Sequence, residues 1–344
     1  MESERGAPTI LGSSQGEKNV TAPDFAEIEL ALVSTAMAGD AGGLYRLASN
    51  LMDRGVPFDS LLFDYLMETE RSVGQRWAQG DYLVAEEHAV TASIETVISL
   101  LAGMFDQPED AAPVVIATAE GDDHSLPARA LAAQLLFAGY RTVFLGADLP
   151  GDDLVEFLEA DPPAAMVLSA AMSGHLLGAR SVINAAHQAG VPVLVGGKAF
   201  GPDGVWAEVV GADGWVQNLR DVQGVIDDWV EDPPELSGST ELSPELAELV
   251  SNRSLAVARA EQALGQNPPS RLRDEVRLVI SAVEGALLTG DDQVVVDMLE
   301  WQEASLNAYE MDAAIVVSAV REALGEYSEA GTQALSRAVE RRSD

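Results

Sequence analysis

The chain has 344 residues, of which 56 are acidic and 20 are basic, so its formal net charge is −36. A surface of this charge repels phosphate backbones, and no compact Lys/Arg cluster offsets it, so we expect no direct nucleic-acid partner. The absence of cysteine excludes disulfides, thiolate metal sites and covalent thioether attachment of a prosthetic group. There is neither a basic start followed by an apolar run nor an apolar stretch of about eighteen residues, which predicts a cytoplasmic protein away from membranes.

The first third of the chain is predicted to be helical after a short tail. Residues 1–22 are rich in Ser, Gly, Pro and charged residues, which predicts a disordered tail. Through residues 23–108, apolar side chains recur at three- and four-residue spacing, as at Leu44, Leu47 and Leu51. Glycine-containing breaks divide this pattern, so we expect a cap of four or five bundled helices.

Residues 109–232 change to the pattern of an α/β domain. Five short apolar runs, rich in β-branched residues, alternate with helical stretches: 113–119, 142–146, 164–170, 191–195 and 213–216. Such alternation implies right-handed crossovers and a flavodoxin-like, doubly wound sheet of five parallel strands. Ligands of such sheets bind outside the carboxyl ends of the strands, so the loops that follow the strands are the candidate site.

An acidic segment with prolines, residues 233–244, is predicted to be a linker to a second helical domain at residues 245–344. The candidate helices of this second helical domain span 245–264, 270–289, 291–324 (as one helix or two) and 326–342. Apolar stripes along them are typical of a bundle core or a dimer interface. The predicted fold class is therefore α/β plus all-α, with a cap bundle, a flavodoxin-like domain and a C-terminal helical domain.

The loop after the first predicted strand, from Glu120 to Pro127, carries the strongest local signal. It follows a buried strand and opens a helix, so His124 is expected at the carboxyl edge of the sheet. There a neutral imidazole can coordinate a metal while the carboxylate of Asp122 holds its other ring nitrogen. One protein ligand suits a metal whose equatorial positions are filled by a macrocycle. By itself Asp-x-His is a weak motif, because a histidine in a loop is more often simply solvated.

The loop resembles the Asp-x-His-x-x-Gly motif of cobalamin-binding proteins of the methionine-synthase type, in which a helical cap precedes a flavodoxin-like domain. The resemblance implies that His124 is the lower axial ligand of cobalt and that Asp122 supports it. Pro127 stands where the family has glycine, and proline is acceptable in the first turn of a helix.

Two further positions extend this resemblance across the sheet. The family's serine near the end of the third strand falls on Ser169, and its paired glycines after the fourth strand fall on Gly196 and Gly197. In the family, the missing side chains leave room for the nucleotide tail of the cofactor. The histidines His175 and His187 are expected in the third crossover, away from cobalt.

The cap carries a second pattern, Trp77 followed after nine intervening residues by Glu87 and His88. It resembles the Trp…Glu-His pattern of adenosylcobalamin-dependent photoreceptors, which implies that these side chains enclose the adenosyl group above the corrin. The alternative is that Trp77 belongs to the core and that Glu87 and His88 lie on a solvated helix face. In the light-responsive regulators, a histidine that ligates cobalt after adenosyl loss follows the tryptophan. Here that residue is Ala78, so His88 is the only cap histidine that can substitute.

The C-terminal helices add a third resemblance. The order of cap, cobalamin domain and helical extension is similar to that of the photocobilins, which also hold a biliverdin near the corrin. The resemblance implies a non-covalent biliverdin, because the chain lacks cysteine. Arginines would pair with the bilin propionates and aromatic side chains would contact the tetrapyrrole; the candidates are Arg273, Arg277, Trp301 and Tyr309. A plain dimerisation bundle is the alternative for this region.

These resemblances predict a light sensor rather than a free-standing enzyme. Photolysis of the cobalt–adenosyl bond of adenosylcobalamin would alter cap packing and oligomeric assembly. A homo-oligomer, with a dimer favoured, and a downstream signalling partner are implied. The main alternative is a corrinoid carrier of a methyltransferase system, which would use the same His124 loop, and a cobalamin storage module is a third. A mutase is disfavoured, because no substrate barrel of about 250 residues is present.

Overall fold

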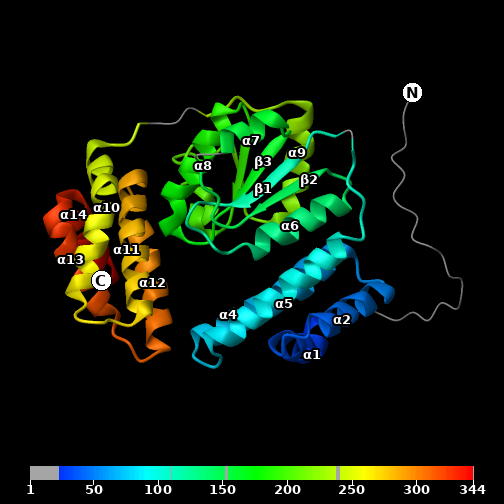
Figure 1. The fold of residues 1–344 in the computed structure, drawn as a ribbon, viewed down its shortest axis with the longest axis horizontal. Coiled ribbons are helices and arrows are strands. Elements are labelled where there is room, and N and C mark those ends of the chain that lie inside the picture. The colour runs from blue at the N-terminus through cyan, green and yellow to red at the C-terminus, as the bar shows by residue number, and fades with distance from the viewer. Residues whose placement is uncertain (1–22, 110, 152–153, 238–240, 344) are drawn as a thin grey trace, which may run out of the picture.

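The computed structural model describes residues 23–109, 111–151, 154–237 and 241–343. The predicted tail at 1–22 lies outside these residues, as does part of the predicted linker. Three parts follow one another along the chain: a helical cap, an α/β part and a C-terminal group of helices (Figure 1). In Figure 1 the cap lies below the α/β part, and the C-terminal helices lie to one side of both.

The cap is formed by helices that run back and forth beneath the sheet. They are α1 (Phe25–Met37), α2 (Ala41–Asp53), α3 (Phe58–Ser60), the π-helical segment η1 (Leu61–Leu66), α4 (Met67–Ala78) and α5 (Val84–Ala102). The apolar spacing of the sequence does not reveal η1, because a π-helical turn inside a longer helix changes the period only locally. The buried cluster of the cap also includes Leu126, Ala130 and Ala133 of α6 (Leu126–Phe137). The cap is therefore held to the α/β part through a shared apolar face.

The α/β part contains five parallel strands in the order β2-β1-β3-β4-β5, which confirms the predicted flavodoxin-like fold. The strands are β1 (Val114–Thr118), β2 (Thr142–Gly146), β3 (Ala165–Ser169), β4 (Val193–Gly196) and β5 (Gly214–Val216). The larger helices beside them are α6, α7 (Leu154–Ala160), α8 (Leu176–Gln188) and α9 (Val222–Glu231). Short 3₁₀ turns in the loops are η2 (Ser173–His175), η3 (Lys198–Phe200), η4 (Pro202–Gly204) and η5 (Leu219–Asp221).

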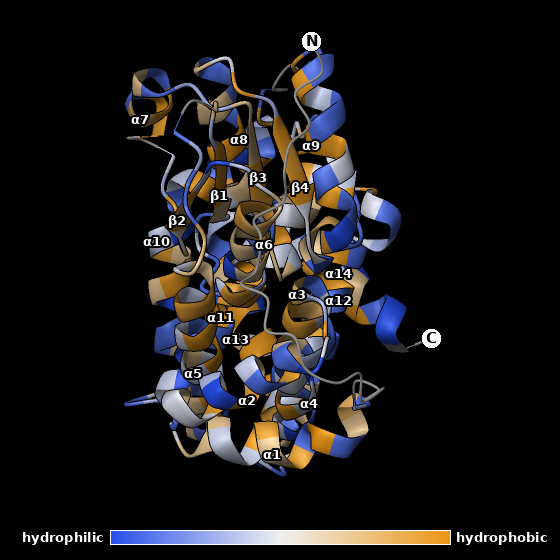
Figure 2. Cartoon of the chain, turned by 90° about the vertical axis from the view of Figure 1, so that its right-hand side faces the viewer, coloured by the Kyte–Doolittle hydropathy of each residue, from blue (hydrophilic) through white to orange (hydrophobic). Residues whose placement is uncertain are grey.

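Alternate side chains of each strand point to opposite faces of the sheet. Val114 and Ile116 belong to a buried cluster with α6 and α9. Val115 and Ala117 belong to a second cluster, with α7 and α8. Because helices cover both faces, the strands are apolar along their length, as Figure 2 shows for β1, β3 and β4.

The C-terminal helices pack onto the α/β part. They are α10 (Pro244–Ala263), α11 (Ser270–Thr289), α12 (Gln293–Asn307), α13 (Ala313–Tyr327) and α14 (Glu329–Ser343). The segment predicted at 291–324 forms two helices, because Asp312 caps α13 by accepting a hydrogen bond from the backbone N–H of Ala314. Buried residues of α11 and α12 share one apolar cluster with the α7/α8 face of the sheet. Every helix in the described part of the chain is too short or too polar to cross a membrane.

Polar contacts at two places supplement the apolar contact between the cap and the α/β part. Glu95 of α5 accepts a hydrogen bond from the hydroxyl of Ser125 and lies 3.7 Å from Nε of Arg129. At the other side, Nη2 of Arg220 donates to Asp64 of η1 at 2.9 Å. Partly exposed pairs of this kind contribute little stability each, and they add polar contacts between the cap and the α/β part at two separate places.

The backbone at Gly197 accepts only glycine. Its φ is +109°, and an added Cβ would lie 2.1 Å from the carbonyl oxygen of Ala170. We expect Gly197→Ala to lower the free energy of unfolding by about 3 kcal/mol or more, measured by urea denaturation of the chain without any added ligand.

Gly224 in α9 provides the matched control, because an added Cβ there would meet no atom within 4 Å. We expect Gly224→Ala to leave stability unchanged or to raise it by up to about 1 kcal/mol, since alanine favours helix over glycine. Equal effects of the two substitutions would contradict the steric argument.

Candidate functional site

The loop after β1 holds His124 through a buried carboxylate. Oδ1 of Asp122 lies 2.7 Å from Nδ1 of His124 and accepts the backbone N–H of the same residue at 3.0 Å. The side chain of Asp122 is only 1% exposed, whereas that of His124 is 55% exposed. Since Nδ1 is occupied, Nε2 is the nitrogen that His124 has available for a ligand.

The second oxygen of Asp122 joins the loop after β3. Oδ2 accepts the backbone N–H of Ala171 at 2.5 Å and lies 3.3 Å from Nδ1 of His175. Nδ1 of His175 is buried and makes no hydrogen bond of good geometry. His175 begins the third crossover, as the sequence predicts, but the fold brings it against Asp122 instead of leaving it remote from the site.

The contact between Asp122 and His124 shifts the pKa values of both side chains. Burial by itself would raise the pKa of Asp122, but its interactions with His124 and His175 outweigh burial and hold that pKa well below its ordinary range. The hydrogen bond to Asp122 raises the pKa of His124, against the opposite effect of burial.

The loop after β2 also holds the loop that contains His124. Oγ1 of Thr118 donates to the carbonyl of Asp122 at 2.5 Å and accepts the backbone N–H of Asp148 at 3.0 Å. Oδ1 of Asp148 in turn accepts the backbone N–H of Gly121 at 2.7 Å. The position of His124 is therefore determined by three neighbouring strand ends.

The remaining residues of the predicted lower face lie at the same edge of the sheet. Thr118 is in register with Ser169 on β3, and Ser169 is in register with Gly196 on β4. Gly197 follows directly, with its backbone beside the carbonyl of Ala170. Pro127 lies in the first turn of α6, where proline needs no amide hydrogen, so the helix forms without the family's glycine.

The cap presents acidic and aromatic side chains from two helices. Burial raises the pKa of Glu70 on α4, the nearby charge of Glu87 raises it further, and His124 and Lys198 lower it. Glu70 therefore lies within electrostatic range of His124. No sequence pattern singles out Glu70, because one glutamate in a charged helix is not distinctive. Glu87 on α5 is partly buried and accepts a hydrogen bond from the hydroxyl of Thr91 at 3.0 Å.

The other two cap residues differ in their surroundings. The side chain of His88 is 75% exposed, and its Nδ1 lies 3.5 Å from a carboxylate oxygen of Glu87. Trp77 is partly buried and donates from Nε1 to the hydroxyl of Tyr309, 2.9 Å away in the C-terminal region. Trp77 thus lies at the junction of the cap with the C-terminal helices.

The four predicted bilin contacts are spread over the C-terminal helices. Arg273 and Arg277 lie exposed on α11, and Arg277 forms ion pairs with Glu261 and Asp274. Trp301 is 37% exposed on α12. Tyr309, in the turn after α12, contacts the cap. These placements leave the bilin contacts an open prediction.

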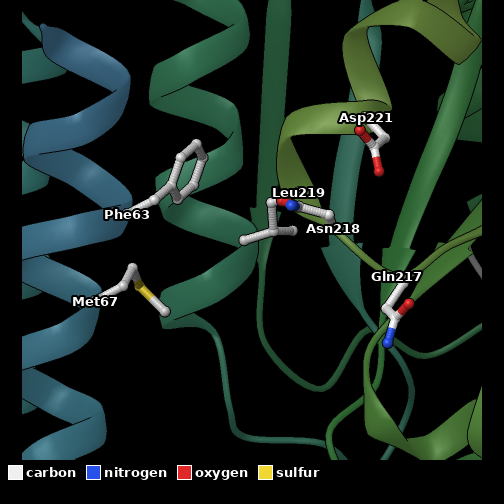
Figure 3. A pocket seen from close by; sticks show the side chains of 6 residues that line it. All are labelled: Phe63, Met67, Gln217, Asn218, Leu219 and Asp221. Atoms are coloured by element: carbon white, nitrogen blue, oxygen red, sulfur yellow. The ribbon is translucent and has the colours of Figure 1, made fainter.

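A cavity of about 600 Å³ lies where the cap meets the carboxyl end of β5. It is lined by Phe63, Met67, Gln217, Asn218, Leu219 and Asp221 (Figure 3). In Figure 3 Phe63 and Met67 of the cap stand on one side and the residues that follow β5 stand on the other. Side chains therefore do not fill all the space between the cap and the strand ends.

These features fit a cobalamin. His124 offers one oriented nitrogen, which suits a metal already held by a macrocycle. Within the described residues, no group of three or more His, Asp or Glu side chains is placed to hold a bare metal ion. The site is therefore a candidate for a corrinoid rather than for a simple metal centre.

Comparison with known proteins agrees with this assignment. Residues 112–220 match a B12 binding domain, and residues 29–102 match a second model of the same description. Trimethylamine corrinoid protein 1 of Methanosarcina mazei is 29% identical over 160 residues, covering 44% of this chain and 73% of that protein. The HTH-type transcriptional repressor CarH of Myxococcus xanthus is 30% identical over 152 residues, covering 41% of this chain and 47% of the repressor.

Among solved structures, the monomethylamine corrinoid protein of Methanosarcina barkeri superposes with a TM-score of 0.49 at 21% identity, covering 58% of this chain and 97% of that one. The two domain matches define the class: the cap and the sheet are B12-binding domains. The chain is accordingly a corrinoid-binding protein with a helical C-terminal extension beyond the matched residues.

The Asp122–His124 pair gives a testable pH dependence. We expect Asp122→Asn to lower the pKa of His124, because the hydrogen-bonded carboxylate raises it in the native chain. NMR titration of the imidazole Cε1 proton in the corrinoid-free protein measures this change. The neighbouring substitution Asp123→Asn is the control, since the charge of Asp123 raises the pKa of His124 less than the charge of Asp122 does.

The same pair makes stability depend on pH with a definite sign. The pKa of folded His124 is raised above its unfolded value of about 6.5, so its stabilisation is complete below that pH and is lost as pH rises through the folded pKa. The pKa of Asp122 is lowered, so its stabilisation is present above about 3.9 and is lost as pH falls through the folded pKa. The stability difference between native chain and Asp122→Asn should be largest between about pH 4 and about pH 6.5. A difference that stays constant up to about pH 9 would contradict this linkage.

Proposed function

We propose that the chain is a light sensor that holds adenosylcobalamin between the cap and the carboxyl ends of the strands. The observation that supports this best is the exposed imidazole of His124, which Asp122 holds at the edge of the sheet. The charges of Glu70 on α4 and of His124 act on one another, which brings α4 within electrostatic range of this loop. Trp77 follows Glu70 by seven residues, which places it on the same face of α4, about 10 Å further along the helix. His124 on the lower side and Trp77 on the upper side would then bound one binding site.

Residues of the strand edge and of the cap would each have a role in holding adenosylcobalamin. Adenosylcobalamin supplies a cobalt–carbon bond that light can break. Nε2 of His124 would bind its lower face, with Asp122 keeping Nδ1 occupied. On the upper side, the indole of Trp77 would pack against adenine, and Glu87 would accept hydrogen bonds from the polar edge of adenine or from the ribose. Loss of these contacts would change the preferred position of the cap, since a ligand shifts an equilibrium through its different affinities for two states.

We further propose a non-covalent biliverdin in the C-terminal region and a light-dependent change of assembly, with a dimer as the first expectation. The bilin proposal is supported by the resemblance to photocobilins and by exposed candidates on adjacent helices, Arg273 on α11 and Trp301 on α12. The chain would act as a signalling protein in the cytoplasm, through a partner protein, and not as an enzyme.

A corrinoid carrier for a methyltransferase is the second candidate function. The match to the trimethylamine corrinoid protein, which spans 73% of that protein, favours it. A carrier would use the same Asp122 and His124, and its methyl group would need no enclosure by Trp77 and Glu87. Affinity for the upper ligand therefore separates the two proposals: a light sensor should prefer adenosylcobalamin to methylcobalamin, and a carrier should not.

The deciding measurement is an absorption spectrum of protein produced with adenosylcobalamin and biliverdin, before and after green light. A red or far-red band that survives desalting, with a light-driven change in the cobalamin bands, is the result we expect. Cobalamin bands that respond to light without a bilin band would leave the C-terminal helices as an assembly module. Cobalamin bands that ignore light would refute the light sensor and favour the carrier.

The proposed role of His124 in holding the cobalt can be tested separately. We expect His124→Ala to weaken binding of hydroxocobalamin by more than about tenfold and to remove the spectral signature of histidine ligation, because His175, the other imidazole beside Asp122, is buried. Asp123→Asn is again the control and should bind as the native chain does. Unchanged ligation in His124→Ala would refute this role for His124.

A further inference from the structure

The junction between the cap and the C-terminal helices is built from three stacked side chains. Nε1 of Trp77 donates to the hydroxyl of Tyr309 at 2.9 Å. The guanidinium carbon of Arg271, at the start of α11, lies 3.9 Å from the ring centroid of Tyr309 and 5.4 Å from that of Trp77. One cation thus contacts both aromatic rings, and the two rings come from opposite sides of the junction.

The C-terminal side of this junction is anchored. Nη2 of Arg271 donates to the hydroxyl of Ser305 at 2.5 Å, and Ser305 is only 2% exposed. The turn that follows α4 also lies against this region, because a Cβ added to Gly80 would be 3.8 Å from the carbonyl oxygen of Ala308. Arg271 is therefore anchored to α12 through Ser305, Tyr309 lies in the turn that follows α12, and Trp77 is the member that the cap brings to them.

The charge of Arg271 reaches the polar interior between α11 and α12. Glu275, one turn along α11, is 3% exposed, and burial raises the pKa of its carboxyl group while Arg271 lowers it. Gln302 of α12 donates to Glu275 at 3.4 Å. A change in the position of Arg271 would therefore alter a buried polar contact between two C-terminal helices.

We propose that Tyr309 and Arg271 are positioning residues for Trp77, so that the C-terminal helices complete the upper side of the corrinoid site. This inference rests on the proposed function, which places Trp77 over the upper ligand. The indole has one N–H donor, and that donor is engaged by Tyr309. Trp77 would therefore contact the upper ligand and Tyr309 at the same time. A change in either contact would affect the other, and this coupling is equal in both directions.

The substitution Tyr309→Phe removes the hydroxyl and keeps the ring that Arg271 contacts. We compare the dissociation constants of adenosylcobalamin and hydroxocobalamin in the dark, for native chain and variant. Adenosylcobalamin should bind about fivefold more weakly to Tyr309→Phe, the loss expected for one hydrogen bond, while hydroxocobalamin should bind as before. Tyr45→Phe is the matched control, since the hydroxyl of Tyr45 donates to the sulfur of Met104 within the cap, away from Trp77 in the sequence.

Hydrogen exchange provides a second readout, and the conservative substitution Arg271→Lys provides a second variant. Amides of residues 305–312 should exchange more slowly with adenosylcobalamin bound than with hydroxocobalamin bound, and this difference should vanish in both variants.

An unchanged ratio of the two dissociation constants in Tyr309→Phe, or equal exchange of 305–312 with both corrinoids in the native chain, would overturn the inference. Both measurements are made in darkness, so a chain that ignores light would refute the light sensor without deciding this coupling.

Discussion

A carboxylate buried at the edge of a sheet is stable in its charged form only if surrounding donors replace the water it has lost. Asp122 obtains them from the backbone N–H and the ring Nδ1 of His124 and from the backbone N–H of Ala171, and His175 lies 3.3 Å from its second oxygen. These partners lie in the loop after β1 and in the loop after β3, so satisfying one charge also joins the two loops. The orientation of His124, and with it every proposed contact to cobalt, depends on that charge.

The cap supplies the opposite side of the site under different constraints. The charge of Glu87 raises the pKa of Glu70, and the positive charges of protonated His124 and of Lys198 act in the opposite direction. The cap is attached to the α/β part by an apolar face and by partly exposed ion pairs that contribute little stability each. Such an attachment can hold the cap in place. It also leaves the position of the cap sensitive to a ligand bound between the cap and the strand ends.

The C-terminal helices are packed on the sheet and also touch the cap. Their arginines are mostly used internally, as in the pairs of Arg253 with Glu284 and of Arg259 with Glu322. Arg271 is different, since its partners include two aromatic rings and a serine hydroxyl. The domain matches end at residue 220, so this extension is where the chain differs from a simple corrinoid-binding unit.

The sequence by itself determined the fold class, the strand positions and the lower-face motif, because these depend on local periodicity and on residue types at short spacing. Only the tertiary structure decided which distant side chains meet: His175 against Asp122, Glu70 near His124, and Tyr309 with Trp77, which is 232 residues away. Such pairs arise from how helices pack on a sheet, and neither composition nor spacing records which faces will touch.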